Sequence, residues 1–443
     1  MTTDSESLLA TLDLTQARWY AGKSRHEQVR RIVDDIPVPD HPTGRLLLIE
    51  IYYADGSGDC YVLPVVPDNA GRLREAEPGD GVYAALVAAC GRGAAAVGQA
   101  GAVAFRALGN PPGPVGEERA LGIDQTNTSV IVGDRIIKLY RRLEAGAHPE
   151  VELVEALTAR GFDSIPAARG AVRYRTTSGV PTDLAIVQNL IPGAADGWES
   201  LIAPLERQLD GTGDPEALGE ELTRVGTTAG LLHAELAAAF GAEPASDTLR
   251  GEWRDTGRKQ LDEALAVLPT DLATELAEYA PRIQAELDGF LASAAPLVTR
   301  VHGDLHIAQF LRTPGGVFVI DFEGEPTRSI DQRCQPTSPL RDIACLMRSL
   351  DHVARSAELR VAERGIDGTV AIDAWISFAQ SAVLVAYEAA LADSPLTLDR
   401  ALLRRFCIEK ELYEFVYAAR ILPEWLYAPQ LGMRWLMRDD AAL

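Results

Sequence analysis

The sequence of 443 residues lacks an ordered cysteine pattern and an excess of basic residues, and each lack excludes a class of protein. Its five cysteines are scattered and form no Cys-x-x-Cys motif or Cys/His cluster, so neither a disulfide scaffold nor a zinc site is predicted. Acidic residues outnumber basic ones, 64 to 42, and the formal net charge is −22. That charge argues against nucleic acid or an anionic membrane as a partner, because both would be repelled.

Segments that would direct the chain into a membrane are also missing. No uncharged apolar run reaches about 18 residues, so no membrane span is predicted. The polar, acidic N-terminus is unlike a signal peptide. We therefore expect a cytoplasmic enzyme, whose oligomeric state the sequence leaves open.

Strand-like runs occupy the first part of the chain, and helix-like runs occupy most of the rest. Runs rich in β-branched and aromatic residues predict strands over residues 45–53, 59–66, 129–132, 135–140, 168–174 and 182–188. Apolar residues at helical spacing predict helices over residues 149–160, 218–240, 259–268, 272–280, 281–292, 371–391 and 402–422. Pro281 either begins a new helix or kinks a longer one. The predicted fold class is α+β, with domains at 1–90, 91–193 and 194–443, and a small strand-rich lobe before a large helical lobe is the layout of a kinase.

The strongest chemical signal is the motif His-Gly-Asp-Leu-His over residues 302–306, followed by Ile-Asp-Phe-Glu over residues 320–323. Phosphoryl transfer to an alcohol needs a carboxylate that positions the hydroxyl and accepts its proton, and Asp304 is the candidate for this catalytic role. It also needs oxygen ligands for Mg²⁺, which Gln309 and Asp321 can offer. The motifs predict a phosphotransferase that uses ATP and Mg²⁺, rather than two surface loops with incidental acids.

A cation for the ATP phosphates is expected from Lys138, which lies in the second strand of a predicted hairpin. In protein kinases, such a strand lysine pairs with a helix glutamate. The helix over residues 149–160 supplies Glu150 and Glu152. We favour Glu152 as the partner, because it lies next to apolar residues and one turn before Glu155, and Glu150 is the alternative.

The rest of the nucleotide site has no glycine-rich signature, since neither a Rossmann fingerprint nor a P-loop motif occurs. The polar stretch before the hairpin can cradle phosphate through hydroxyl and backbone N–H groups, and it can also be an ordinary turn. Its candidate residues are Gln125, Asn127, Thr128 and Ser129. Backbone groups of Gln188 and Leu190 are expected at a hinge that meets adenine, or in a connection without a ligand. Asp342 is interpreted as a helix cap that supports the catalytic loop.

These motifs resemble the aminoglycoside phosphotransferase and choline kinase-like superfamily, in which HGDxHxxN precedes a strand and IDFE or IDWE. Gln309 stands where many members have Asn. Further stretches, at residues 18–24, 125–129, 195–198, 338–344 and 348–351, resemble the bacterial maltokinases. The resemblance implies a bilobal, eukaryotic-protein-kinase-like fold with an N-terminal cap domain fused to the small lobe.

The end of the chain is more similar to actinobacterial glucosamine kinases, in the segments FVYAAR and WLYAP that follow EKELYE. On the predicted helix, Glu409, Tyr413 and Arg420 share one face, which can line a sugar groove or simply be a solvated face. Glu409 is the favoured partner for a sugar ammonium group, with Glu414 as the alternative. The candidate sugar-binding residues are Asp196, His306, Glu323, Glu409, Tyr413, Glu414, Arg420 and Trp425.

Three functions compete on these grounds. The first is a glucosamine kinase that makes glucosamine 6-phosphate, and the second is a maltokinase that makes maltose 1-phosphate. The third is a pseudokinase that senses nucleotide or acts as a scaffold. The joint presence of Lys138, Asp304 and the two candidate metal ligands argues against the third, because a scaffold does not need them together.

Overall fold

The computed structural model describes residues 9, 14, 17, 19–109, 115–122, 127–176, 179–292, 294–325, 328–367 and 369–438. The chain forms two compact units, which are Met1–Pro192 with Arg328–Gln332 (unit 1) and Gly193–Thr327 with Arg333–Leu443 (unit 2). The predicted cap domain and all but the last residue of the predicted small lobe fall inside unit 1. Among the described residues, no helix is long and apolar enough to cross a membrane.

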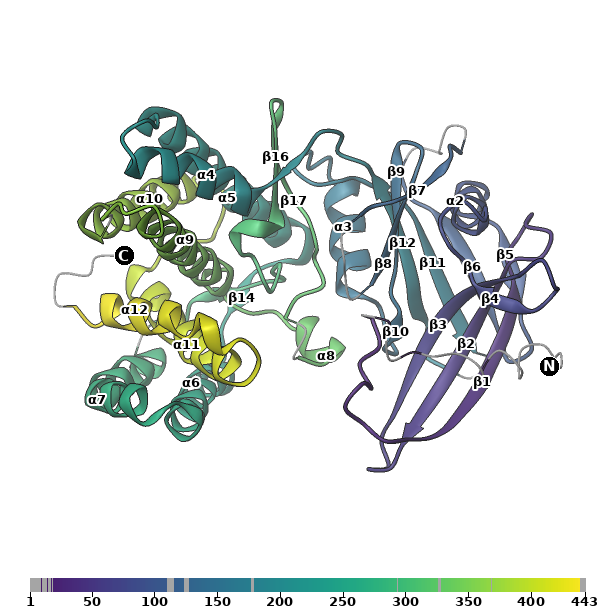
Figure 1. Cartoon of the computed structure of the whole chain (residues 1–443), viewed down its shortest axis with the longest axis horizontal. Helices are drawn as coiled ribbons and strands as arrows, with labels where there is room; N and C mark the ends of the chain where they lie inside the picture. Colours follow the sequence, from purple (N-terminus) through teal and green to yellow (C-terminus); the bar gives the residue numbers. More distant parts are fainter. Residues whose placement is uncertain are drawn as a thin grey trace. The chain divides into compact units, whose positions relative to one another are not determined.

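Unit 1 contains two antiparallel sheets, which Figure 1 draws in purple and blue. The first has the strand order β1-β2-β3-β10, with β4 paired to β3, and the second has the order β5-β6-β11-β12-β9-β8-β7. The elements are β1 (Glu27–Pro37), β2 (Arg45–Tyr53), β3 (Gly58–Pro67), β4 (Leu73–Glu75), α2 (Val82–Arg92), β5 (Ala95–Val97), β6 (Gly101–Ala107), β7 (Glu118–Ala120), β8 (Thr128–Val132), β9 (Arg135–Leu139), β10 (Arg142–Leu143), α3 (Pro149–Ala159), β11 (Ala168–Thr176) and β12 (Thr182–Asn189).

One hydrophobic core joins the two sheets and α2. Side chains such as Leu46 from β2, Leu86 from α2 and Val187 from β12 are buried in the same cluster. The β8–β9 hairpin turns at Gly133, whose φ of 62° suits glycine because it has no Cβ. The shared core crosses residue 90, so the predicted cap domain and small lobe are packed as one body.

Unit 2 is mainly helical, and α9 lies among α4, α10, α11 and α12 (Figure 1). Its elements are β13 (Ala195–Asp196), α4 (Gly197–Leu209), α5 (Pro215–Phe240), β14 (Glu243–Pro244), α6 (Asp247–Val267), α7 (Thr270–Ala292), β15 (Leu297–Val298), η1 (Ile307–Gln309), β16 (Phe310–Thr313), β17 (Gly316–Val319), α9 (Leu340–Ala362), α10 (Thr369–Ala390), α11 (Arg400–Ile421), η2 (Pro423–Trp425) and α12 (Tyr427–Leu436). The short α8 (Ile330–Arg333) lies in the segment where the chain passes between units.

The helices of unit 2 begin where the sequence supplies capping residues. The side chains of Asp214, Ser246 and Asp399 accept backbone N–H groups at the starts of α5, α6 and α11. The two helices predicted on either side of Pro281 form one helix, α7, with the proline inside it. The α+β fold class is confirmed.

Candidate active site

The loop of the His-Gly-Asp motif is anchored by the first turn of α9. The buried carboxylate of Asp342 accepts hydrogen bonds from the backbone N–H groups of His302 and Gly303, both at 2.8 Å. Its Oδ2 also lies 3.1 Å from Nε2 of His233. Burial raises the pKa of Asp342, but these hydrogen bonds and the nearby histidines lower it more, and the net shift is downward. The interpretation of Asp342 as support for the loop agrees with these contacts.

A second turn of α9 holds the other side of the same loop. The hydroxyl of Ser349 accepts a hydrogen bond from the backbone N–H of Ile307 at 2.9 Å. The thiol of Cys345, also on α9, lies 3.5 Å from Oδ1 of Asp304 and can donate to it. Because these residues follow Asp342 at helical spacing, one face of α9 positions the whole loop around Asp304.

Lys410 on α11 is a neighbour of Asp304 that the sequence analysis missed. Its Nζ lies 3.9 Å from Oδ1 of Asp304 and 3.1 Å from Oε1 of Glu414, and the ammonium sits 4.5 Å from the ring centroid of Tyr413. Burial lowers the pKa of Lys410, but Cys345 and the two carboxylates outweigh that effect and raise it well above its ordinary value. The Lys410 side chain is therefore a protonated ammonium group beside the candidate catalytic carboxylate.

His306 completes the immediate surroundings of Asp304. Its Nε2 lies 3.9 Å from Oδ2 of Asp304 and 3.2 Å from Nε2 of Gln309. Burial lowers the pKa of His306 below its ordinary value, although Asp304 opposes the shift. The imidazole is therefore neutral at neutral pH.

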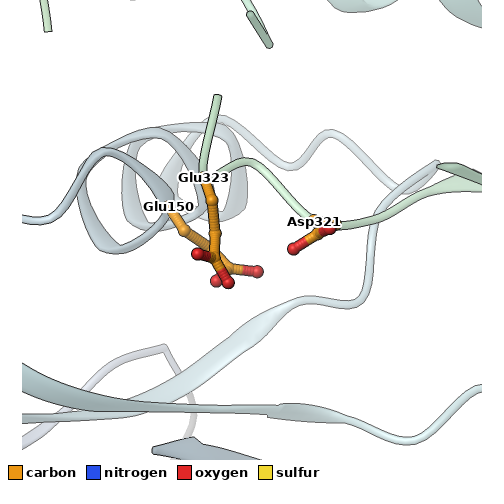
Figure 2. A group of neighbouring side chains, drawn as sticks. All are labelled: Glu150, Asp321 and Glu323. Carbon is orange, nitrogen blue, oxygen red and sulfur yellow. The ribbon is translucent and has the colours of Figure 1, made fainter. Parts of the chain in front are cut away.

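The two predicted metal ligands contact each other. Nε2 of Gln309 donates to Oδ2 of Asp321 at 3.2 Å, so their side chains converge. Asp321 has φ of 66°, a left-handed conformation that is unusual for a residue with a side chain and is often found at functional sites. Figure 2 shows Asp321 and Glu323 on the stretch that follows β17, and Glu150 on α3 of unit 1. The backbone carbonyl of Glu323 accepts a hydrogen bond from Arg333.

The ion pair of Lys138 corrects the favoured partner from the sequence. Nζ of Lys138 lies 3.0 Å from Oε2 of Glu150, whose side chain is 2 % exposed, so the pair forms with Glu150 and the choice of Glu152 was wrong. Tyr140 donates to the same oxygen at 3.0 Å. The physical reason is that residues two apart point to different sides of a helix. Glu150 lies on the buried side of α3, whereas Glu152 is half-buried.

The polar stretch before β8 is only partly described. Gln125 lies outside the described residues. Asn127 accepts a hydrogen bond from the backbone N–H of Arg141, and the hydroxyl of Thr128 accepts one from Nε of the same arginine. Ser129 is paired in register with Lys138 across the hairpin. A role in phosphate binding stays a prediction for these residues.

The predicted hinge residues have partners within unit 1. The side chain of Gln188 is buried and donates to the carbonyl of Pro166. The backbone N–H of Leu190 donates to the carbonyl of Asp134 at 2.9 Å, so this N–H already has a partner in the protein. Contact of the backbone groups of Gln188 and Leu190 with adenine stays a prediction.

Two of the predicted sugar ligands have partners within unit 2, and for Asp196 a role in sugar binding stays a prediction. Both carboxylate oxygens of Glu409 accept from Arg341, at 2.8 and 2.9 Å, and the Glu409 side chain is 3 % exposed. Asp196 is exposed and caps α4 by accepting from the backbone N–H groups of Trp198 and Glu199. The expectation that Glu409 binds a sugar ammonium group is corrected, because its acceptors are already paired inside the unit.

The predicted sugar ligands near the end of the chain have different surroundings in unit 2. Arg420 forms an ion pair with Glu263 at 2.6 Å, and its side chain is half exposed. Tyr413 stacks on Tyr417, and Trp425 lies 6.2 Å from Trp198 between ring centroids. Tyr413 and Glu414 thus lie with Lys410 beside Asp304, while Arg420 belongs to a surface ion pair.

A strand lysine paired with a helix glutamate, and a carboxylate loop beside converging Gln and Asp side chains, are the parts of a kinase-type phosphotransferase. A family model described as "Phosphotransferase enzyme family" matches residues 117–375. The match covers more than half of the chain, and the protein belongs to this family. The prediction of a phosphotransferase is thereby confirmed.

Relatives and a solved structure are similar over almost the whole chain. A glucosamine kinase of Streptacidiphilus jiangxiensis is 35% identical over 389 residues, covering 86% of each chain. A glucosamine kinase of Mycolicibacterium smegmatis is 31% identical over 384 residues, covering 86% of this chain and 94% of the relative. The structure of a glucosamine kinase in complex with glucosamine, ADP and inorganic phosphate matches with a TM-score of 0.79 and 30% identity, covering 99% of this chain and 100% of that one. The predicted protein-kinase-like fold is confirmed.

Proposed function

We propose that this protein is an ATP- and Mg²⁺-dependent glucosamine kinase that makes glucosamine 6-phosphate. The observation that carries the proposal is its similarity, over 86% of both chains, to the glucosamine kinase of Streptacidiphilus jiangxiensis. A solved glucosamine kinase that matches 99% of this chain contains glucosamine and ADP, which supports the same substrate and nucleotide class here.

Asp304 is the proposed catalytic carboxylate. It would accept the proton of the sugar hydroxyl while that oxygen bonds to the γ-phosphorus of ATP and ADP leaves. The contacts of Asp342 and Ser349 with the loop hold the carboxylate in place. Nζ of Lys410 lies 3.9 Å from Oδ1 of Asp304 and places a cation beside the reacting groups.

Gln309 and Asp321 are the proposed ligands for Mg²⁺. Both offer oxygen atoms, which hard divalent cations prefer, and the hydrogen bond between their side chains shows that they converge. When bound there, Mg²⁺ would neutralise charge on the phosphates. Glu323 is two residues from Asp321 on the same stretch and is a further candidate carboxylate (Figure 2).

Lys138 is the proposed phosphate-binding cation of unit 1. Its pairing with the buried Glu150 fixes the ammonium group, which reduces the entropy lost when it binds phosphate. Asn127, Thr128 and Ser129 remain candidates for the phosphate loop because they lie on or directly before the neighbouring strand, β8.

Glu414, rather than Glu409, is the proposed partner of the sugar ammonium group. It is half-buried next to Lys410 and therefore belongs to the cluster around Asp304. A carboxylate accepts several hydrogen bonds, so a contact with Lys410 through Oε1 leaves capacity for a second cation. Tyr413, His306 and Trp425 remain candidates for contacts with the sugar ring.

The test is a comparison of ATP turnover with glucosamine, glucose and maltose, each with and without Mg²⁺. We expect turnover with glucosamine that depends on Mg²⁺, and weak turnover with glucose, which lacks the ammonium group. Efficient phosphorylation of maltose without turnover of glucosamine would replace the proposal with a maltokinase and leave the catalytic assignments in place.

A further inference from the structure

The helices α5 and α10 of unit 2 lie side by side (Figure 1), and a groove of about 730 Å³ is lined by residues of both. A Cβ added to Gly226 would overlap the carbonyl oxygen of Val383, and one added to Gly230 would overlap that of Tyr387. The two helices therefore approach each other closely, and larger side chains on either side line the groove. We call this feature the α5–α10 groove.

Three large apolar side chains are exposed in the α5–α10 groove. Leu231 of α5 is 43 % exposed, and Phe378 and Val385 of α10 are 48 % and 59 % exposed. None of the described residues that line the groove is charged, although 24 % of the chain is. The hydroxyl of Thr223, on the α5 side, already donates to the carbonyl of Gly219 at 2.9 Å, so covering it leaves no unpaired donor. Contiguous exposed apolar surface of this kind is typical of a protein–protein contact.

One stripe of exposed residues on α10 reads nearly the same in both directions. At helical spacing its side chains are small, large, small, large and small, in the order Ala374, Phe378, Ser381, Val385 and Ala389. An antiparallel second α10, with a two-fold axis near Ser381, would bring Phe378 of each copy beside Val385 of the other. A surface that complements itself in this way is what a two-fold symmetric interface needs.

The surface that α5 and α10 present together is large enough for a stable dimer. The 22 residues of α10 span about 33 Å, and two helices side by side are about 20 Å wide, which gives roughly 650 Å² in projection. A specific interface buries about 800 Å² on each partner. Because side chains roughen the surface, its accessible area exceeds the projected area, and the two values are comparable.

Charge also favours a second copy over a partner of different chemistry. A charged peptide or polyelectrolyte is recognised through opposite charges, and the described lining of the groove offers none. Arg224, next to Thr223 in the sequence, is already paired with Glu221 at 2.8 Å. The groove is therefore matched by another uncharged apolar surface, and the same groove on a second copy is such a surface.

We propose that the α5–α10 groove is the interface of a homodimer, in which α10 of each copy lies antiparallel against α10 of the other. The dimer is independent of the proposed function, because none of its residues is assigned to catalysis or to substrate binding. The net charge of −22 on each copy opposes association at long range, and salt screens this repulsion. The dimer should therefore become tighter as the NaCl concentration rises.

Sedimentation equilibrium of the full chain, from about 0.5 to about 50 µM and at low and high NaCl, measures the dissociation constant. The variants are Val385→Asp, which places an unpaired charge in the groove, and the milder Phe378→Ser. Each should raise the dissociation constant by about 30- to 1,000-fold, because every substitution occurs twice in the dimer. Leu291→Asp is the matched control and should dimerise like the wild type. Leu291 is 40 % exposed on α7, which packs on α6 and α11.

Cross-linking tests the antiparallel arrangement itself. In Ser381→Cys the two new thiols lie near the two-fold axis, so mild oxidation should give a disulfide-linked dimer much faster than in Leu291→Cys. The wild-type protein supplies the background from the five natural cysteines. Equal rates of cross-linking in the two variants would contradict the arrangement.

A wild-type protein that stays monomeric at every concentration and salt would overturn the proposal. A dimer that both Val385→Asp and Phe378→Ser leave intact would overturn it too, because such a dimer uses another surface. Circular dichroism checks that each variant is folded. If the charge in Val385→Asp prevents folding, Phe378→Ser and the cross-linking rates decide the outcome.

Discussion

The carboxylates of α11 differ in their partners, and this decides what each of them can do. Glu409 is held by both terminal nitrogens of Arg341, while Glu414 shares Lys410 with Asp304. A charged group whose acceptors are already paired inside the protein gains little from a ligand, because the ligand must first displace that partner. The two glutamates should therefore respond differently to substitution.

Substitutions at these two positions give the first prediction. Glu409→Ala should lower the free energy of unfolding by about 3–5 kcal/mol, since it leaves the Arg341 charge without its partner. Glu414→Gln should instead lower kcat/KM for glucosamine by about 10- to 150-fold, the equivalent of a hydrogen bond to a charged group. Urea unfolding and steady-state kinetics on both variants check this contrast.

A control for the charge change itself is Glu275→Gln, which alters a surface ion pair with Arg434 in the same unit. It should leave both stability and kinetics nearly unchanged. If Glu409→Ala folded as stably as the wild type but lost glucosamine turnover, the assignment of the ammonium site to Glu414 would be wrong.

Asp304 supplies the second prediction. Asp304→Asn keeps the shape of the side chain and removes its ability to accept a proton, so kcat should fall by about 10²- to 10⁴-fold. The affinity for ADP, measured by calorimetry, and the unfolding midpoint should stay close to wild type. Near-normal turnover in this variant would falsify the role of Asp304.

The pair of Lys138 and Glu150 supplies the third prediction. Lys138→Ala should raise KM for ATP, and Glu150→Gln should do so less, because it removes the partner and not the cation. A double-mutant cycle should show a coupling of about 0.5–3 kcal/mol, since the two residues act as one unit. Lys259→Ala, at an exposed lysine of α6, is the control. Strictly additive effects would argue that the pair has no role in nucleotide use.

At the scale of elements, α9 is the helix that organises the catalytic loop. Its residues Asp342, Cys345 and Ser349 contact the loop on one face, and it packs against α11, which carries Lys410. The motif around Asp304 is local in sequence and could therefore be predicted. Lys410 lies more than a hundred residues from Asp304, and helix packing brings the two together, so no local pattern revealed it.

The contrast between local sequence and long-range packing also explains which other structural predictions were right and which were missed. The predicted strand over residues 45–53 has the bounds of β2, because its continuous run of apolar and aromatic residues is visible in sequence. The first half of α6 was not predicted, since it holds only Leu249 and Trp253 as large apolar residues. Glu150 and Glu152 could not be separated because the orientation of a short helix depends on the sheet that it packs against.

The buried contacts of Asp342 lead to a prediction for pH. Its pKa is lowered in the folded protein, so the stabilisation it supplies is present above the pKa of the unfolded chain, near 4, and is lost as pH falls through the folded value. Asp342→Asn cannot titrate. We expect the difference in the free energy of unfolding between wild type and variant to be largest at pH 5–7 and to narrow below pH 4. Urea unfolding from pH 7 to pH 3 measures it, and parallel curves would contradict the prediction.

At the scale of the whole molecule, the two units carry different parts of the proposed chemistry. Unit 1 holds Lys138 and Glu150, and unit 2 holds the candidate catalytic, metal and sugar groups. The division between a strand-rich and a helical part could be predicted from the order of periodic segments. The common core of the two sheets in unit 1 could not, because it depends on contacts between strands distant in sequence.

The net charge of −22 acts on the two substrates in opposite directions. A negative field attracts the glucosamine cation and repels the ATP anion, and salt screens both effects, with a Debye length of about 10 Å at 0.1 M. At saturating ATP and fixed free Mg²⁺, kcat/KM for glucosamine should therefore fall several-fold as NaCl rises from low to high concentration. Glucose carries no charge, so its weak turnover should change little and serves as the control. An equal fall for both sugars would show that salt acts on the protein's stability or on ATP, and not on the approach of a cationic sugar.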